Sequence, residues 1–244
     1  MIGQTRSEFL KIRSTRTTIG LVIALVALML LFVLLTGFLS HTDSLRGPED
    51  QRNFLGIGSF ASVFAVLAGI LVVTNEYRFG TIRPTFVFTP RRWVVLTAKY
   101  VASMLAGIGF AVVGQGIPLA IGLGILAGRG IHRSLGWGSV LQLGLGTVVA
   151  AALWGGIGVG VGALVRNHIG AVVGVLVWVF VVENLLFGLV PSVGRFTPGR
   201  AQDALTGMST DHLLPAAAGG AVLLGWSLVL LAAGLAVTRA RDVD

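Results

Sequence analysis

Ionisable side chains that could do chemistry gather in one segment of the sequence, residues 75–99, which reads NEYRFGTIRPTFVFTPRRWVVLTAK. The segment holds one carboxylate, Glu76, and five basic side chains. Gly80 is suited to ending a helix, and Thr89 followed by Pro90 is suited to starting another, as an N-cap and a first helical residue. A segment that served only as a source of positive charge would not need these signals. We therefore expect an organised contact surface.

Two arginines in this segment stand where their charge is unfavourable. Arg91 and Arg92 would lie in the first turn of the new helix, where the helix dipole disfavours positive charge by roughly 0.3–1 kcal/mol each. An acidic protein surface or membrane phosphates would offset that cost. We interpret the segment as one that transmits motion between a partner and the neighbouring helices. The residues assigned to this role are Glu76, Arg78, Gly80, Thr81, Arg83, Pro90, Arg91, Arg92 and Lys99.

Two polar residues inside apolar runs are candidates for a substrate path or an outer gate. Glu183 is the only acidic residue within such a run, and a carboxylate there is a functional-site hypothesis by default. The alternative is that it reaches the membrane interface or pairs with a loop arginine such as Arg195. Gln115 could line a path or bond across helices, and Gly116 and Pro118 beside it predict a kink.

The sequence lacks the residue sets that several reaction classes require. It has no cysteine, which excludes disulfides and thiolate metal sites. All four histidines fall between the apolar runs, at positions 41, 132, 168 and 212. A P-loop needs Lys followed by Ser or Thr, but Lys11 precedes Ile12 and Lys99 precedes Tyr100. We expect no catalytic residue, no metal and no cofactor in this chain.

The composition is that of a protein that crosses a membrane several times. Of 244 residues, 55% are hydrophobic and only 11% are charged, against roughly 25% charged in a soluble domain, and mean hydropathy is +0.89. We predict a single all-α membrane domain over residues 1–244 with six spans. Their expected bounds are 19–39, 54–74, 100–127, 140–165, 169–190 and 216–238. Residues 166–168 must form a tight hairpin turn, because one helix over 140–190 would be about 75 Å long against an apolar core of about 30 Å.

Basic residues are distributed unevenly over the two ends of these spans. The termini and the segments 75–99 and 166–168 hold 12 of them, and the opposite loops hold six. The excess predicts that both termini and the segment 75–99 are cytoplasmic, so the net charge of +8 reflects topology and does not indicate nucleic acid. Residues 2–17 are basic and weakly amphipathic, which predicts a helix on the anionic membrane face. A disordered basic tail is the alternative.

Glycines recur at four-residue spacing in the fourth and fifth spans. The pairs are Gly156 with Gly160, Gly158 with Gly162, and Gly170 with Gly174. Small residues at this spacing let helices approach closely. We expect them to pack these two spans against each other.

The segment 75–99 resembles the loop between the second and third spans of ABC-2 type transporter permeases, in the pattern E-[YF]-R-x-G-T-I-R-x-T…P-x-R-x-x…A-K. The residues that carry the pattern are Glu76, Tyr77, Arg78, Gly80, Thr81, Ile82, Arg83, Thr85, Pro90, Arg92, Ala98 and Lys99. The basic start SEFLKIRSTR, residues 7–16, is similar to the N-terminal elbow helix of this family, and residues 239–243 are similar to its tails. Pro84 departs from the pattern.

The resemblance implies the permease subunit of an exporter in the bacterial cytoplasmic membrane. Such a subunit would pair with a second permease half and dock on a separate P-loop ATPase, which would hold ATP and Mg²⁺. The segment 75–99 would be the coupling loop and 166–168 a second contact. The substrate would be hydrophobic or amphipathic, such as a drug, a lipid or a peptide. Family members place short re-entrant helices before the last span, here within 191–215, although a plain loop fits this sequence equally.

Two other functions compete with this one. A secondary transporter would use intramembrane Asp, Glu or His for ion coupling, and only Glu183 is available. A membrane anchor or assembly protein that transports nothing would not need an organised segment at 75–99.

Overall fold

The computed structural model describes residues 2–81, 92–208, 210 and 212–240. In this part of the chain six helices are long and apolar enough to cross a membrane, and no strand is present. Their bounds are Arg16–Leu39, Pro48–Arg78, Trp93–Gly128, Trp137–Val165, His168–Leu189 and Ala216–Ala240. The predicted all-α membrane class and the number of spans are therefore confirmed.

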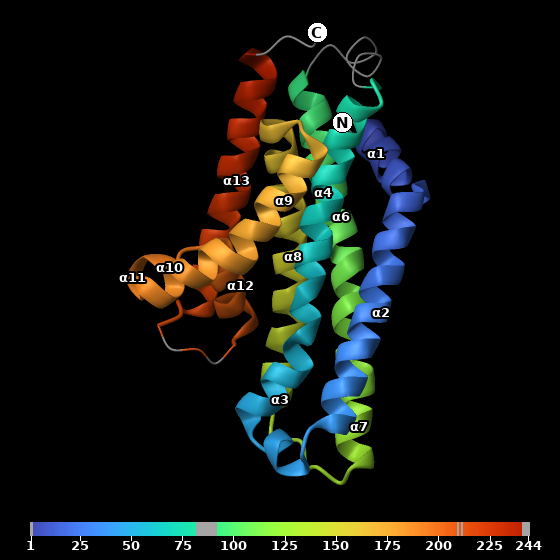
Figure 1. The fold of residues 1–244 in the computed structure, drawn as a ribbon. Helices are drawn as coiled ribbons and strands as arrows, with labels where there is room; N and C mark the ends of the chain where they lie inside the picture. The colour runs from blue at the N-terminus through green and yellow to red at the C-terminus, as the bar shows by residue number, and fades with distance from the viewer. Residues whose placement is uncertain (1, 82–91, 209, 211, 241–244) are drawn as a thin grey trace.

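Several spans are built from consecutive helical segments, as Figure 1 shows. The elements in chain order are α1 (Ile2–Ser14), α2 (Arg16–Leu39), η1 (Thr42–Leu45), α3 (Pro48–Leu55), η2 (Gly56–Phe60), α4 (Ala61–Arg78), α6 (Arg92–Ile117), η3 (Pro118–Gly122), α7 (Leu123–Gly128), α8 (Trp137–Val165), α9 (His168–Val177), η4 (Trp178–Val182), α10 (Glu183–Leu189), α11 (Pro191–Gly194), α12 (Pro198–Thr206) and α13 (Ala216–Ala240). The kink predicted near Pro118 coincides with η3, a π-helical turn that keeps the third span continuous.

The fourth span, α8, is the centre of the bundle. Of its most apolar stretch 72% is buried, against 11% for the fifth span. Glycines let neighbouring backbones come close to it: Gly158 lies against the Val66 carbonyl of α4, and Gly155 against the Ser103 carbonyl of α6. Gly160 lies against Leu230 of α13. The core of the bundle is therefore a set of close backbone contacts around one helix.

The prediction that glycines pack the fourth span against the fifth was wrong. A side chain at Gly174 would meet no atom, and one at Gly170 would meet only its own turn at Val165 and Asn167. The hairpin turn itself was predicted correctly, with Arg166 in the left-handed region and the Asn167 side chain accepting a hydrogen bond from the Gly170 amide. Figure 1 shows the reason: α9 slopes away from α8 after this turn, and α10 lies at the edge of the bundle.

Two spans begin earlier than their apolar runs. The third span begins at Trp93 and not at residue 100, so Lys99 lies inside a helix. The second begins at Pro48, because a proline at the first helical position and acidic residues in the first turn favour a helix start there. At its other end α4 continues to Arg78. The connecting segment between the second and third spans therefore shrinks from 75–99 to 79–91.

The segment between the fifth and last spans is partly helical. Pro191 and Pro198 each occupy a first helical position, in α11 and α12. The short helix α12 packs between α8 and α13, where Gly146 lies against the Leu205 carbonyl and Gly219 against the Ala201 carbonyl. The described part of the segment 191–215 therefore contains two short helices and is not a plain loop.

Candidate functional site: a buried ion-pair network

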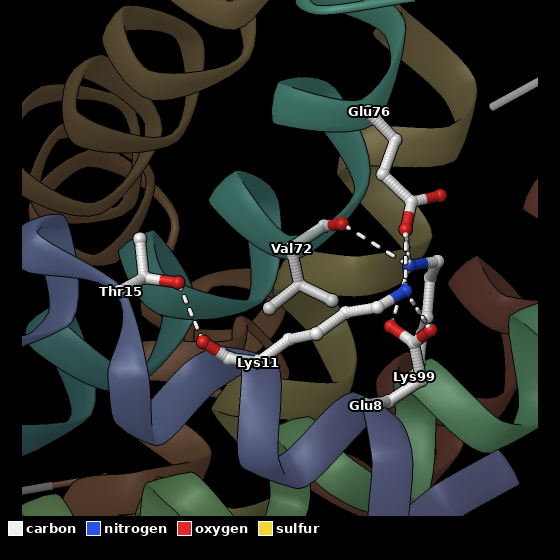
Figure 2. Close-up of polar contacts among 6 residues, drawn as sticks. All are labelled: Glu8, Lys11, Thr15, Val72, Glu76 and Lys99. Carbon is white, nitrogen blue, oxygen red and sulfur yellow. Dashed lines mark hydrogen bonds and ion pairs between the residues drawn. The ribbon is translucent and has the colours of Figure 1, made fainter. Parts of the chain in front are cut away.

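Four charged residues from three helices meet at the end of the bundle where α1 lies (Figures 1 and 2). We call this set, Glu8 and Lys11 of α1, Glu76 of α4 and Lys99 of α6, the four-residue network. Lys99 Nζ lies 2.7 Å from Glu8 Oε2 and 2.6 Å from Glu76 Oε1. Lys11 Nζ lies 2.8 Å from Glu8 Oε1 and 3.4 Å from Glu76 Oε1. Each ammonium group therefore bridges both carboxylates.

Lys99 is the most deeply buried member of the network. Its residue exposure is 1%, and its ammonium group also donates to the Val72 carbonyl at 3.4 Å. Glu8 is 3% exposed and Glu76 8%. Two negative and two positive charges leave the set neutral, and their short mutual contacts offset the cost of removing the buried members from water. One carboxylate oxygen, Glu76 Oε2, is buried with no hydrogen-bond partner among the described residues.

The electrostatics of the α1 members follow from burial and pairing together. Burial favours the neutral form of Glu8, but Lys99 and then Lys11 outweigh it and hold the pKa of Glu8 below its usual value of 4.5. Burial likewise opposes the charge of Lys11, but Glu8 and then Glu76 raise the pKa of Lys11 above its usual value of 10.5. Both groups are therefore charged near neutral pH.

The network fastens three helices at the root of the segment 79–91. Glu76 lies in the last turn of α4, and Lys99 lies in the second turn of α6. These two helices flank the segment. Glu8 ties α1 to α6 through Lys99, and Lys11 ties α1 to α4 through Glu76. A force that tilts the segment would therefore act on α4, α6 and α1 together, because buried ion pairs at these distances resist separation.

Among the described residues, the structure brings together two of those predicted for coupling, Glu76 and Lys99. Arg78 lies outside the network, with its guanidinium 5.5 Å from the centre of the Phe79 ring. Gly80 adopts a φ of 68°, a left-handed conformation that favours glycine, just after α4 ends. Thr81 is exposed in the same turn. Arg83, Pro90 and Arg91 lie outside the described residues, and Arg92 is the first residue of α6.

Sequence reasoning missed Glu8 and treated Lys11 as one more topology charge. A compositional signal was available. Of the 18 basic residues of the chain only two are lysines, and both of them are in the network. A compact ammonium with three donors can bridge two carboxylates at one point, which the planar guanidinium of Arg does less readily. Because every other basic residue is Arg, the two lysines are the unusual positions and could have been singled out from the sequence.

The structure places Glu183 in a different region, at the start of α10, and buries it to 2% exposure. Its Oε2 accepts a hydrogen bond of 2.7 Å from the Gly199 amide of α12. Arg195 is not its partner: that guanidinium lies 5.0 Å from the centre of the Phe196 ring. Neither the pairing with Arg195 nor a reach to the interface therefore describes this carboxylate.

Gln115 forms a hydrogen-bonded bridge between helices. Its side-chain amide donates to the Leu55 carbonyl at 2.9 Å, and its oxygen accepts from the Thr147 hydroxyl at 3.2 Å. Gln115 is 2% exposed, so the nitrogen and the oxygen of its side-chain amide both form their hydrogen bonds inside the bundle. Of the two possibilities left open by the sequence, the bond across helices is the one that the structure contains.

No protein-family model matches the chain, and no curated protein matches it either. Within the described residues no three His, Asp or Glu side chains gather as a metal site would require.

Proposed function

We propose that this chain is the permease subunit of an ATP-driven transporter, and that the four-residue network is the joint through which a separate P-loop ATPase moves the spans. The observation that carries the proposal is Lys99, a buried lysine that bridges Glu8 and Glu76 at the root of the segment 79–91. Topology alone needs exposed positive charge there. It does not need a neutral, buried network that ties three helices to one connecting segment.

The mechanism follows from what the network joins. An ATPase docked on the segment 79–91, and on the turn at Arg166, would change the tilt of that segment when it binds and hydrolyses ATP. Because α4 and α6 are fastened to each other and to α1, they would tilt as one unit. Close backbone packing around α8 would pass the tilt to the bundle. A second permease half would complete the path for a hydrophobic or amphipathic substrate.

The test compares two glycine variants in vesicles that contain the permease and its partner ATPase. Gly80→Val strains the left-handed turn beside the network, whereas Gly128→Val lies at the far end of the third span, where a side chain meets open space. We expect both to insert normally, and only Gly80→Val to lose most ATP-dependent flux. Equal flux from the two variants would contradict the role of this segment. ATP hydrolysis by the purified chain alone would contradict the subunit assignment.

A secondary transporter is the second candidate, and Glu183 is the observation that favours it. Its Oε1 is buried without a hydrogen-bond partner in the described part of the chain, as a proton-carrying carboxylate could be. Flux that survives an inactive ATPase but stops when a protonophore collapses the proton gradient would support this candidate. An absence of flux with an active ATPase and an intact proton gradient would leave only the membrane anchor.

A further inference from the structure

A cavity of about 360 Å³ lies beside Glu183, within the size range of small-molecule sites. Its walls come from segments far apart in the sequence: η2 and α4, the middle of α8, the η4–α10 bend of the fifth span, and α12. The cavity does not touch the four-residue network. Figure 1 shows that α9 and α10 diverge from α8, and residues of α12 line the cavity from the other side.

Four buried polar atoms without hydrogen-bond partners belong to residues that line this one cavity. They are Ser62 Oγ, Trp154 Nε1, Glu183 Oε1 and Gln202 Oε1, from residues that are each at most 9% exposed. Thr197 and Trp178 also lie beside the Glu183 carboxylate, but neither forms a hydrogen bond with Oε1. Buried polar groups are normally paired, so a cluster of unpaired ones around a space indicates a ligand that pairs them.

One carboxylate that lines the cavity, Glu183, has no basic partner among the described residues. Arg200 is committed elsewhere: it lies 3.0 Å from Asp203 Oδ2, donates to Asn184 Oδ1 at 2.7 Å, and covers the Phe187 ring. Asp203 is therefore neutralised by Arg200. The Oε2 of Glu183 accepts from the Gly199 amide, and its Oε1 has no hydrogen-bond partner among the described residues. The missing counter-charge is a single positive one.

Apolar side chains form much of the remaining wall, which also includes Asn53 and Ser59. Val63, Val66, Val175 and Leu176 line the interior. Phe60 and Phe180, which stack with ring centres 6.4 Å apart, also line the cavity and are 40% and 49% exposed. Aromatic faces attract cations. A molecule with an apolar body could therefore enter between these rings from the side of the bundle.

The geometry points to a binding site for an amphiphilic amine in this cavity: the ammonium group bonds to Glu183 and Gln202, a neighbouring hydroxyl accepts from the Trp154 indole, and the apolar body lies along the valines. Two unpaired acceptors match the donors of an ammonium, and one obligate donor matches the hydroxyl. An anionic ligand would place a second negative charge beside Glu183. The inference names a substrate class and so rests on the proposed function, but the binding itself needs only this chain.

The test measures binding to the purified full chain in lipid nanodiscs, without ATPase. The probes are a radiolabelled phenylalkyl amino alcohol and its neutral counterpart, in which a hydroxyl replaces the amine, with empty nanodiscs as the background. We expect saturable binding of the amine, weakened roughly tenfold or more by Glu183→Gln, because a charge-assisted bond is lost. Gln can still accept the Gly199 amide, so the fold is kept. Glu49→Gln, an exposed carboxylate outside the cavity, is the matched control and should bind like wild type.

Three results would overturn the inference: no saturable binding of the amine, equal affinity for the two probes, or equal weakening by both Glu variants. If Glu183→Gln does not fold, Trp154→Phe decides with a third probe, the same phenylalkyl amine without its hydroxyl. The variant should weaken binding of the amino alcohol severalfold and leave binding of this third probe unchanged. Equal effects on both amines would also count against the site. Amine binding without ATP-driven flux would uphold the cavity and reject the proposed function.

Discussion

Lys99 is a positive charge with almost no contact with solvent, and its side chain is only 2% exposed. Removing one partner of a buried ion pair leaves the others uncompensated and costs about 3–5 kcal/mol. We expect Lys99→Met to destabilise the protein by this amount, seen as a lower midpoint of thermal unfolding in detergent. Lys11→Met is the matched comparison, because the Lys11 side chain is 54% exposed and water can replace part of its role. An equal loss in the two variants would show that the network does not depend on the buried lysine.

Local patterns could identify Glu76 and Lys99 but not their partner. Both residues flank a segment with visible helix signals, so a role there could be predicted from the sequence. Glu8 lies 91 residues from Lys99, and its own turn, where it pairs with Lys11, does not indicate that a lysine of another helix will reach it. Glu183 was recognised because an acidic residue within an apolar run is conspicuous. The amide that binds it comes from α12, a helix that no apolar run predicts.

Helix α1 depends on charge to stay docked, which makes its attachment sensitive to pH. Glu8 has a lowered pKa, so its contribution is fully present above its usual value of 4.5 and is lost as the pH falls through the lower folded value. Lys11 has a raised pKa, so its contribution is present below 10.5 and is lost as the pH rises through the higher folded value.

We therefore expect the amides of α1 to be most protected in the broad range between these limits. Hydrogen exchange of α1, followed by mass spectrometry and corrected for intrinsic rates, measures this directly. Exchange should increase at the acidic end, and Glu8→Gln should abolish that increase while α8 stays unchanged. A flat profile for the wild-type protein would contradict an electrostatic attachment.

Glycines of α8 and α9 differ in whether the structure has room for a side chain on them. A methyl group at Gly158 would overlap the Val66 carbonyl of α4, which is backbone and cannot rotate away. We expect Gly158→Ala to destabilise the protein by about 1–3 kcal/mol, the usual cost of overpacking. Gly174→Ala meets open space and should be neutral or slightly stabilising. Thermal unfolding of both variants tests the assignment, and the reverse ranking would place the fifth span against α8 after all.

The glycine spacing correctly predicted close helix packing around α8, but the helix named as its neighbour, the fifth span, was wrong. The sequence shows that α8 can be approached closely, but not which helix approaches it. That choice depends on the angle at the Arg166 turn and on the bend at η4, neither of which leaves a local pattern. Span ends were misplaced for a related reason: apolar runs mark the hydrocarbon core, while helices continue past it wherever polar groups find partners.

On the scale of the molecule, the end of the bundle that carries the network should face the cytoplasm. The absence of native cysteine allows a clean test. Asp43→Cys and Phe79→Cys place thiols at exposed positions near opposite ends of the bundle. An impermeant thiol reagent added outside intact cells should label the first and spare the second until the cells are opened. Labelling of Phe79→Cys in intact cells would reverse the orientation.

The network also constrains the order in which the protein can be built. Glu8 and Glu76 leave the ribosome before Lys99, so the first two spans enter the bilayer with carboxylates that only Lys11 can pair. The third span then delivers the charge that locks all three helices, which gives a late assembly step a driving force of its own. A force-sensitive arrest peptide should therefore register a pull on the nascent chain as Lys99 enters the membrane. Glu8→Gln should weaken that pull without changing the third span at all, and an unchanged pull would mean that the helices assemble before the charges meet.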